Sequence, residues 1–226
     1  MSDVRRIDYT GEGLSEAELA PTPFQQVRRW LDDAAARSEA RGDVPEPYAL
    51  SVATVDADGT PNVRTVLMRL FDETGPAFLT NTSSTKGSEL AGNSRVAASL
   101  TWPAMFRAIR FRGSAELLDR DVVTAYFGSR PWGSRISAWA SQQSQPVASR
   151  AELEQAYETY AARWPDRGNV DDVPVPDFWG GYRIRCDEVE FWGGRSNRLH
   201  DRLVFTRVTE GTLDDVNAWT VSRRQP

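Results

Sequence analysis

Apolar residues recur along this chain at two spacings, one typical of helices and one typical of strands. Helical spacing of three to four residues is kept by Phe24, Val27, Trp30, Leu31 and Ala34. Thr22 and Pro23 precede this run as a helix start, and Gly42 with the prolines at 45 and 47 ends it. The pattern predicts an amphipathic helix at the beginning of the folded region.

Runs of β-forming residues follow over 48–55, 63–71 and 77–80. Asp58 and Gly59 form a strong hairpin signal between the first two runs, and residues 72–75 form a second turn. We therefore predict a three-stranded antiparallel meander. Ser83 and Ser84 then offer an N-cap for a short helix that reaches Leu90. Further strands are predicted over 96–100 and 106–118.

The C-terminal half of the chain adds helices and more strands. Helices are predicted over 121–127 and 151–164, the second capped by Ser149 with Glu152 three residues later. After a linker at 174–176, strand candidates occur over 182–184, 189–192, 203–208 and 219–221. The first 118 residues supply about five strands with no regular helix between them, which favours a barrel over a doubly wound parallel sheet. The predicted fold class is mainly β with flanking helices (α+β).

Two regions are distinguished by their patterning. Residues 1–20 are polar and glycine-bearing without a sustained period, which predicts a flexible N-terminal arm. Residues 21–226 contain no internal repeat, heptad run or break in composition, so we interpret them as a single domain.

The composition excludes several classes of function. The 226 residues carry 32 acidic and 27 basic side chains, a net charge of -5 that disfavours nucleic-acid binding through bulk electrostatics. Cys186 and His200 are single examples of their kind, which excludes a disulfide framework and a zinc site built from cysteine and histidine, so no metal is expected. There is no apolar stretch of ~20 residues for a membrane helix and no signal-peptide core, so we expect a soluble cytoplasmic protein.

One of the 27 basic residues is a lysine, Lys86, and its position is informative. It lies in a hydroxyl-rich turn over 80–87 that opens the short predicted helix. Backbone N–H groups at a helix start favour an anion, and a lysine in the first turn opposes the helix dipole unless something negative compensates it. A bound phosphate would do so. The alternative is a serine-capped helix with an exposed lysine.

Two arginines interrupt an otherwise apolar strand pattern. Arg64 and Arg69 lie an odd number of positions apart, so in a regular strand they point to opposite faces of the sheet. A sheet commonly has solvated side chains on one face, but solvated arginines on both of its faces would be unusual. A barrel whose outer face is covered by a second subunit would remove this difficulty.

A second candidate anion site lies between the predicted helices. Tyr126, Arg130 and Ser134 are spaced four apart, so continuous helical geometry would place a phenol, a guanidinium and a hydroxyl on one face. These groups can hold a phosphate, although Pro131 and Gly133 interrupt the helical pattern. Decoration of a helix surface is the alternative.

The histidine lies in a basic segment near the C-terminal end. Residues 189–194 form an aromatic strand and a glycine turn, and Arg198, His200 and Arg202 follow. Alternation in an extended segment would place these three side chains on one face. A lone histidine is usually a structural residue, but this segment concentrates positive charge in an acidic protein.

These elements, in this order, resemble the pyridoxamine 5′-phosphate oxidase family. The resemblance runs from about residue 24 to residue 226, and its most specific segments are 64–69, 126–131, 178–182, 190–194 and 198–202. It implies a Greek-key-like, FMN-binding split β-barrel that forms a homodimer, with FMN at the subunit interface. It also implies hydride transfer from the substrate C4′ carbon to the flavin, followed by reoxidation of the flavin by molecular oxygen to give hydrogen peroxide.

The resemblance also implies roles for individual residues. The positions that match FMN contacts are Arg64, Thr65, Val66, Leu67, Leu79, Thr80, Thr85, Lys86, Gln143, Ser144, Trp192 and Arg202. The positions that match the substrate-phosphate cluster are Arg69, Tyr126, Arg130 and Ser134. Arg198 and His200 match the catalytic pair that sits over the substrate ring.

The chain departs from the family pattern at Arg69, Thr85 and Ala108. Arg69 stands where the family usually has lysine, Thr85 where an FMN-binding arginine is usual, and Ala108 where a glutamine contacts the flavin. Arginine and lysine are not interchangeable at a tight phosphate site, because the guanidinium fork is wider than an ammonium.

Three functions remain open from the sequence. The leading hypothesis is an FMN-dependent oxidase that converts pyridoxamine or pyridoxine 5′-phosphate to pyridoxal 5′-phosphate. A second is a paralogous flavin oxidase of the phenazine type that acts on another substrate. The third is a non-catalytic protein that binds FMN or pyridoxal phosphate.

Overall fold

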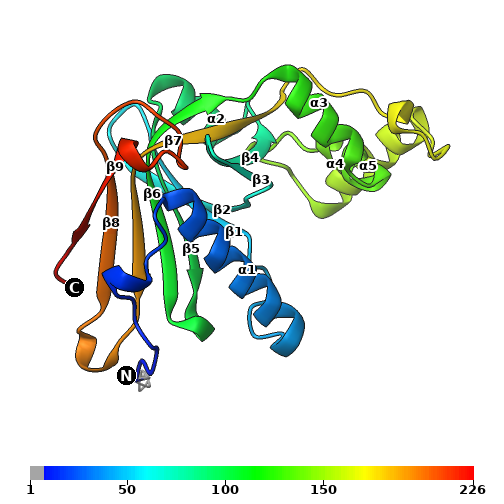
Figure 1. The fold of residues 1–226 in the computed structure, drawn as a ribbon. Helices are drawn as coiled ribbons and strands as arrows, with labels where there is room; N and C mark the ends of the chain where they lie inside the picture. The colour runs from blue at the N-terminus through cyan, green and yellow to red at the C-terminus, as the bar shows by residue number, and fades with distance from the viewer. Residues whose placement is uncertain (1–7) are drawn as a thin grey trace.

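An antiparallel sheet organises the computed structural model, which describes residues 8–226 (Figure 1). Its strands within that range are β1 (Ala49–Val55), β2 (Pro61–Leu67), β3 (Leu70–Asp72), β4 (Gly75–Asn81), β5 (Arg95–Trp102), β6 (Arg107–Leu117), β7 (Trp179–Gly193), β8 (Asp201–Arg207) and β9 (Trp219–Arg223). The order along the main path is β2-β1-β5-β6-β7-β4-β3, and β8 and β9 extend from β7. This is the mainly β architecture that the sequence predicted.

Strand β7 joins the parts of the barrel. Along its length it pairs with β4, β6 and β8, so two neighbours share one of its edges. The two runs expected at 182–184 and 189–192 are therefore one continuous strand. The middle of β7 is buried, and Ile184, Val189 and Phe191 are fully excluded from solvent.

The predicted three-stranded meander is correct in its two hairpins, because β1 pairs with β2 and β3 pairs with β4, but its middle strand is not continuous. The run over 63–71 breaks into β2 and β3, because the Met68 N–H donates to the Tyr48 carbonyl while the next N–H, of Arg69, donates to the Ala77 carbonyl. The chain thus changes partner strand at this point. As a result β2 stays at the edge beside β1, and β4 pairs with β7 rather than with β2.

Five α-helices lie around the barrel in the described part of the chain. They are α1 (Pro23–Arg41), α2 (Thr85–Gly92), α3 (Arg120–Ser129), α4 (Trp132–Ala140) and α5 (Arg150–Arg163). The predicted start of α1 is confirmed, since the Thr22 hydroxyl accepts a hydrogen bond from the Gln25 N–H, and Gly42 ends the helix with a φ of 68°. The Ser149 cap of α5 is confirmed in the same way by the Glu152 N–H.

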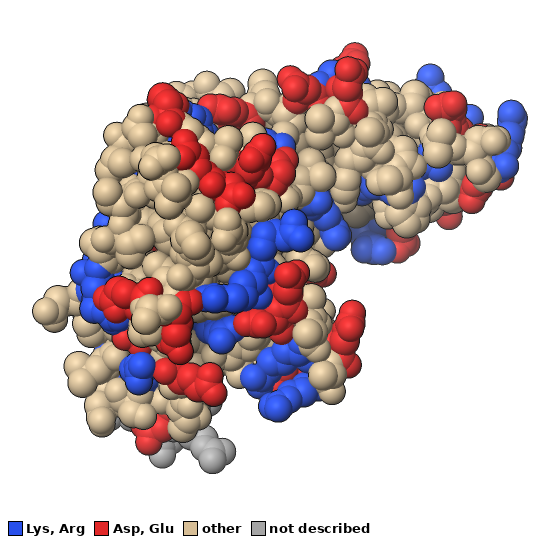
Figure 2. All heavy atoms as spheres, viewed as in Figure 1, with Lys and Arg blue, Asp and Glu red and all other residues tan. Residues whose placement is uncertain are grey.

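Helices α3, α4 and α5 form a group beside the barrel, as Figure 1 shows. They have an apolar cluster of their own, built around Phe127, Ile136 and Val173, whereas α1 packs its apolar face into the barrel core. Figure 2 shows Lys and Arg side chains gathered in the concave region between the barrel and this group. A single domain over residues 21–226 stays our interpretation.

The expected flexible arm over 1–20 lies partly outside the described residues. From residue 8 onward the chain follows the barrel instead of leaving it, because Leu14 is an apolar residue that joins the core at 4% exposure. The Leu14 N–H donates to the buried carboxylate of Asp201 at 2.9 Å. No helix in the described part of the chain is long and apolar enough to cross a membrane.

Candidate active site

A cavity of about 670 Å³ lies where β2, β4 and the start of α2 meet helices α3 and α4. All but four of the site residues predicted from the sequence line this cavity. Those lining it are Arg64, Thr65, Val66, Leu67, Arg69, Leu79, Thr80, Thr85, Lys86, Tyr126, Arg130, Ser134, Gln143 and Ser144. The cavity therefore brings together segments that are separated by up to half of the chain.

Lys86 is the most buried cation of this cavity, at 6% exposure. Its Nζ donates to the Gln143 side-chain carbonyl at 2.7 Å, to the Thr80 hydroxyl at 3.0 Å and to the Ser84 hydroxyl at 3.1 Å. All three acceptors are neutral, and no carboxylate of residues 8–226 pairs with it. Burial, and then the nearby charge of Arg64, lower the pKa of Lys86 to about 8. The ammonium is held in place without a counter-ion.

Arg64 is held beside Lys86 by a carboxylate that the sequence reasoning missed. Its Nη2 donates to Glu89 at 2.8 Å, and its Nη1 donates to the Thr54 hydroxyl and the Val52 carbonyl. Burial raises the pKa of the Glu89 carboxyl, but hydrogen bonds from Thr54, Asn62 and Arg64 outweigh it and lower that pKa. Nothing in the sequence pattern distinguished Glu89 from other helix glutamates as the partner of Arg64.

Arg69 reaches the same cavity as Arg64, so the expectation that the two point to opposite faces is wrong. The rule of alternation applies within one regular strand. Here β2 ends at Leu67, before Arg69, so the alternation of side chains does not continue from Arg64 to Arg69. Both arginines line one cavity.

Tyr126, Arg130 and Ser134 also meet at the cavity, but not on one continuous helix. Helix α3 ends at Ser129, Arg130 is extended (φ -74°, ψ 146°), and α4 begins at Trp132. Pro131 at this junction interrupts the helical hydrogen bonds. The turn still directs all three side chains into the cavity.

Arg130 is a half-buried cation with no charged partner among residues 8–226. Its guanidinium carbon lies 4.4 Å from the ring centroid of Trp179, and its Nη1 is buried with no hydrogen-bond acceptor. Burial, and also the charge of Arg69, lower its pKa. Trp179, a cavity residue to which the sequence reasoning gave no role, has a buried Nε1 that lacks an acceptor as well.

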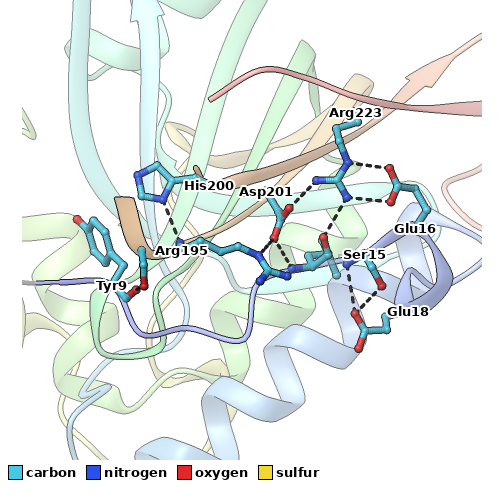
Figure 3. Close-up of polar contacts among 10 residues, drawn as sticks. Tyr9, Ser15, Glu16, Glu18, Arg195, His200, Asp201 and Arg223 are labelled. Atoms are coloured by element: carbon cyan, nitrogen blue, oxygen red, sulfur yellow. Dashed lines mark hydrogen bonds and ion pairs between the residues drawn. The ribbon is translucent and has the colours of Figure 1, made fainter. Parts of the chain in front are cut away.

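Trp192, Arg198, His200 and Arg202 do not line this cavity. His200 Nδ1 accepts the Arg195 N–H at 3.1 Å, and its ring lies 5.3 Å from that of Tyr9 (Figure 3). The His200 ring also lies 4.7 Å from that of Trp192. The expected alternation from Arg198 to Arg202 is wrong, because Arg198 lies in a turn with a φ of 62° and β8 begins at Asp201.

Arg202 is fixed by a buried carboxylate. Its Nε and Nη2 donate to the two oxygens of Glu190 at 3.0 and 2.7 Å, and Glu190 is 3% exposed. Arg110 donates to the same carboxylate. Burial raises the pKa of Glu190, but the hydrogen bond from Arg202 and the charge of Arg110 outweigh it and lower that pKa. The nominated residues thus form two separate groups in one chain.

Comparison with known proteins shows the family. The family model described as pyridoxamine 5′-phosphate oxidase matches residues 36–163, which is more than half of the chain. A second, described as the pyridoxine 5′-phosphate oxidase C-terminal dimerisation region, matches residues 179–226. The chain belongs to the pyridoxamine 5′-phosphate oxidase family. It is an FMN-dependent oxidase.

Relatives of similar length support this membership. The pyridoxine/pyridoxamine 5′-phosphate oxidase of Kineococcus radiotolerans is 46% identical over 223 residues, covering 98% of this chain and 97% of the relative. The protein of the same name from Streptomyces avermitilis is 46% identical over 221 residues, covering 98% of this chain and 94% of the relative.

Solved structures show the same fold. PhzG from Burkholderia lata 383, solved in complex with tetrahydrophenazine-1-carboxylic acid, superposes with a TM-score of 0.81 at 27% identity and covers 96% of this chain and 100% of PhzG. An FMN-binding protein of Nostoc punctiforme superposes with a TM-score of 0.66 at 17% identity, over 88% of this chain and 97% of its own. The split barrel predicted for this oxidase family is confirmed.

The cavity fits FMN in its charge and its donors. Lys86 and Arg64 form one pair of neighbouring cations, and Arg69 and Arg130 form another. Among residues 8–226, buried Lys86 has no carboxylate partner and half-buried Arg130 has a buried Nη1 with no acceptor, so an anion would compensate both, because a buried charge is costly unless it is paired. Two dianions, the phosphates of a flavin and of a substrate, would satisfy the two pairs.

Proposed function

We propose that this oxidase converts pyridoxamine 5′-phosphate or pyridoxine 5′-phosphate to pyridoxal 5′-phosphate, with oxygen reduced to hydrogen peroxide. The observation that carries the proposal is the presence of two cation pairs in one cavity, Lys86 with Arg64 and Arg69 with Arg130. A single phosphorylated ligand needs only one such pair. The names of the relatives that are 46% identical over nearly the whole chain support the same substrates.

The residues divide into two binding groups in this proposal. Lys86 and Arg64 hold the flavin phosphate, with Thr80 and Gln143 fixing the ammonium. FMN, when bound, takes up the hydride from the substrate C4′ carbon and passes the electrons on to oxygen.

The substrate is held by the other group. Arg69 and Arg130 bind its phosphate by charge-assisted hydrogen bonds, and the Tyr126 phenol and the Ser134 hydroxyl add neutral donors to the same oxygens. Binding at the phosphate fixes one end of the substrate, so that its C4′ carbon is presented in a defined orientation.

A second copy of the chain completes the site in this proposal. Trp192, Arg198, His200 and Arg202 lie away from the cavity of their own chain, yet they fall in the segment that matches a dimerisation region. In a homodimer these residues of one protomer reach the cavity of the other. Arg198 and His200 then cover the substrate ring on the side away from the flavin, and Trp192 and Arg202 contact FMN.

The phenazine-type oxidase is the second candidate, because the PhzG structure superposes over nearly the whole chain. The higher identity to the pyridoxine/pyridoxamine 5′-phosphate oxidases, 46% against 27%, favours the vitamer substrate. A non-catalytic FMN-binding role would leave Arg69 and Arg130 without a ligand.

Oxygen uptake by the FMN-loaded protein separates these functions. We expect rapid uptake with pyridoxamine 5′-phosphate, slow uptake with unphosphorylated pyridoxamine and none with a reduced phenazine carboxylate. Uptake with the phenazine alone would establish the second candidate. No uptake with any of the three, despite bound FMN, would overturn the proposed substrates.

A further inference from the structure

Glu89 lies at the centre of a hydrogen-bonded network behind the cavity. Its Oε2 accepts from Arg64 at 2.8 Å and from the Thr54 hydroxyl, and its Oε1 accepts from the Asn62 amide at 3.0 Å. The side chain is 7% exposed and that of Arg64 is 19% exposed. A carboxylate with three donors and so little solvent holds its partners in fixed positions.

The fold explains why these groups meet. Asn62 and Arg64 are two apart on β2, so their side chains share one face, and they pair in register with Thr54 and Val52 of β1. Helix α2 brings Glu89 over this face. Glu89 also follows Lys86 by three residues, which places the carboxylate and the ammonium one above the other on the helix. Glu89 therefore bonds directly to Arg64 and lies on the same side of α2 as Lys86, without an ion pair to the ammonium.

The network leaves part of Arg64 free. A guanidinium has five N–H hydrogens, and the Glu89, Thr54 and Val52 acceptors engage Nη1 and one hydrogen of Nη2. The Nε–H has no acceptor among residues 8–226, and Arg64 lines the cavity. A guanidinium tied on one side therefore offers its remaining donors to a ligand on the other.

We propose that Glu89 is a positioning residue for flavin binding, which orients Arg64 beside Lys86 so that both cations meet the FMN phosphate. The inference rests on the proposed role of Arg64 as a phosphate ligand. It assigns Glu89 a contribution to affinity although its own negative charge repels the phosphate. In this chain the contribution matters more because Thr85, a neutral residue, stands beside the pair.

The test compares FMN with riboflavin, which lacks the phosphate, in titrations of the full-length protein followed by quenching of flavin fluorescence. Wild-type protein should bind FMN much more tightly than riboflavin. In Glu89→Ala we expect FMN affinity to fall about tenfold and riboflavin affinity to stay unchanged. Glu89→Gln keeps an acceptor for Arg64 and should recover affinity to within about threefold of wild type. Glu39→Ala, on the exposed face of α1, is the matched control.

A double-mutant cycle shows whether Glu89 acts through Arg64. In an Arg64→Ala background, Glu89→Ala should cause no further loss of FMN affinity. If the losses of FMN binding free energy in Arg64→Ala and Glu89→Ala add in the double variant, the proposal is overturned. Tighter FMN binding by Glu89→Ala would also overturn the proposal, since it would mean that repulsion outweighs positioning.

Glu89→Asp provides a second variant if Glu89→Ala does not fold. It keeps the negative charge but shortens the reach to Arg64, so FMN affinity should again fall while riboflavin affinity holds. Unchanged FMN affinity in Glu89→Asp would overturn the proposal. If the wild-type protein does not distinguish FMN from riboflavin, the proposed phosphate site itself fails, and this result is separate from any effect of Glu89.

Discussion

Replacing Lys86 by methionine tests the proposed flavin-phosphate site most sharply. The substitution keeps an unbranched side chain of similar length in a position that is 6% exposed, but it removes an ammonium held by three neutral oxygens. A hydrogen bond to a charged group contributes about 1.5 to 3 kcal/mol. We therefore expect the Kd for FMN to rise roughly 10- to 150-fold, since 1.4 kcal/mol is tenfold. Arg150→Met, which removes an exposed cation from α5, is the matched control for net charge.

The pH dependence of FMN binding provides a second readout for the same residue. Burial, and also the charge of Arg64, lower the pKa of Lys86 to about 8 in the ligand-free protein, so the ammonium that binds phosphate is lost above that pH. Binding the dianion favours the charged form, and wild-type affinity should fall by up to about tenfold per pH unit above pH 8. Affinity in Lys86→Met should not change over this range.

The folding stability of the FMN-free protein should rise with pH, whereas FMN affinity should fall. In the FMN-free protein the pKa of Lys86 is about 8, below its ordinary 10.5, so between these values the unfolded chain binds more protons than the folded one. The free energy of unfolding therefore gains a contribution that rises with pH from 8 to 10.5, and Lys86→Met removes it. Flavin titrations and thermal melts at pH 7, 8 and 9.5 measure both effects. Unchanged FMN affinity, or a wild-type affinity that does not depend on pH, would refute the assignment.

Three further predictions concern the other parts of the molecule. Arg130→Ala should raise KM for pyridoxamine 5′-phosphate at least tenfold while FMN content stays normal, because it removes a bidentate cation from the substrate group; equal KM values would contradict this role. Arg198→Ala and His200→Ala should lower kcat and raise KM without loss of FMN or of the dimer, as steady-state kinetics and sedimentation would show, whereas loss of flavin would indicate a structural role. Ser149→Ala removes the cap of α5 and should lower the free energy of unfolding by about 1 kcal/mol, measured by denaturant titration, with activity unchanged.

Local signals allowed much of the fold to be predicted. The ends of α1 followed from Thr22 and Gly42, because a cap and a left-handed glycine act within one turn of the helix. The continuity of the middle strand of the meander could not be predicted from local signals in the same way. Whether the run over 63–71 continues or breaks after Leu67 depends on which carbonyl each N–H meets, Tyr48 or Ala77, and these partners are set by the whole sheet.

The site was predictable where residue type alone carried the chemistry. Lys86 could be singled out as the lysine of an arginine-rich chain, and it is a buried cation in the cavity. Glu89 and Trp179 could not, because a glutamate on a helix or a tryptophan before a strand is ordinary until its partner is known. Spacing rules for Arg64 and Arg69 failed since they assume one regular element.

Quantifying two products of the reaction, pyridoxal 5′-phosphate and hydrogen peroxide, tests the central claim most directly. With pyridoxamine 5′-phosphate, water and oxygen, the FMN-loaded protein should form pyridoxal 5′-phosphate, ammonia and hydrogen peroxide in equal amounts, each matching the oxygen consumed. Pyridoxal 5′-phosphate measured by its absorbance and peroxide measured by a coupled peroxidase should therefore rise together at a ratio of one to one. Oxygen uptake without pyridoxal 5′-phosphate, or no turnover of the phosphorylated vitamer by FMN-loaded protein, would contradict the account.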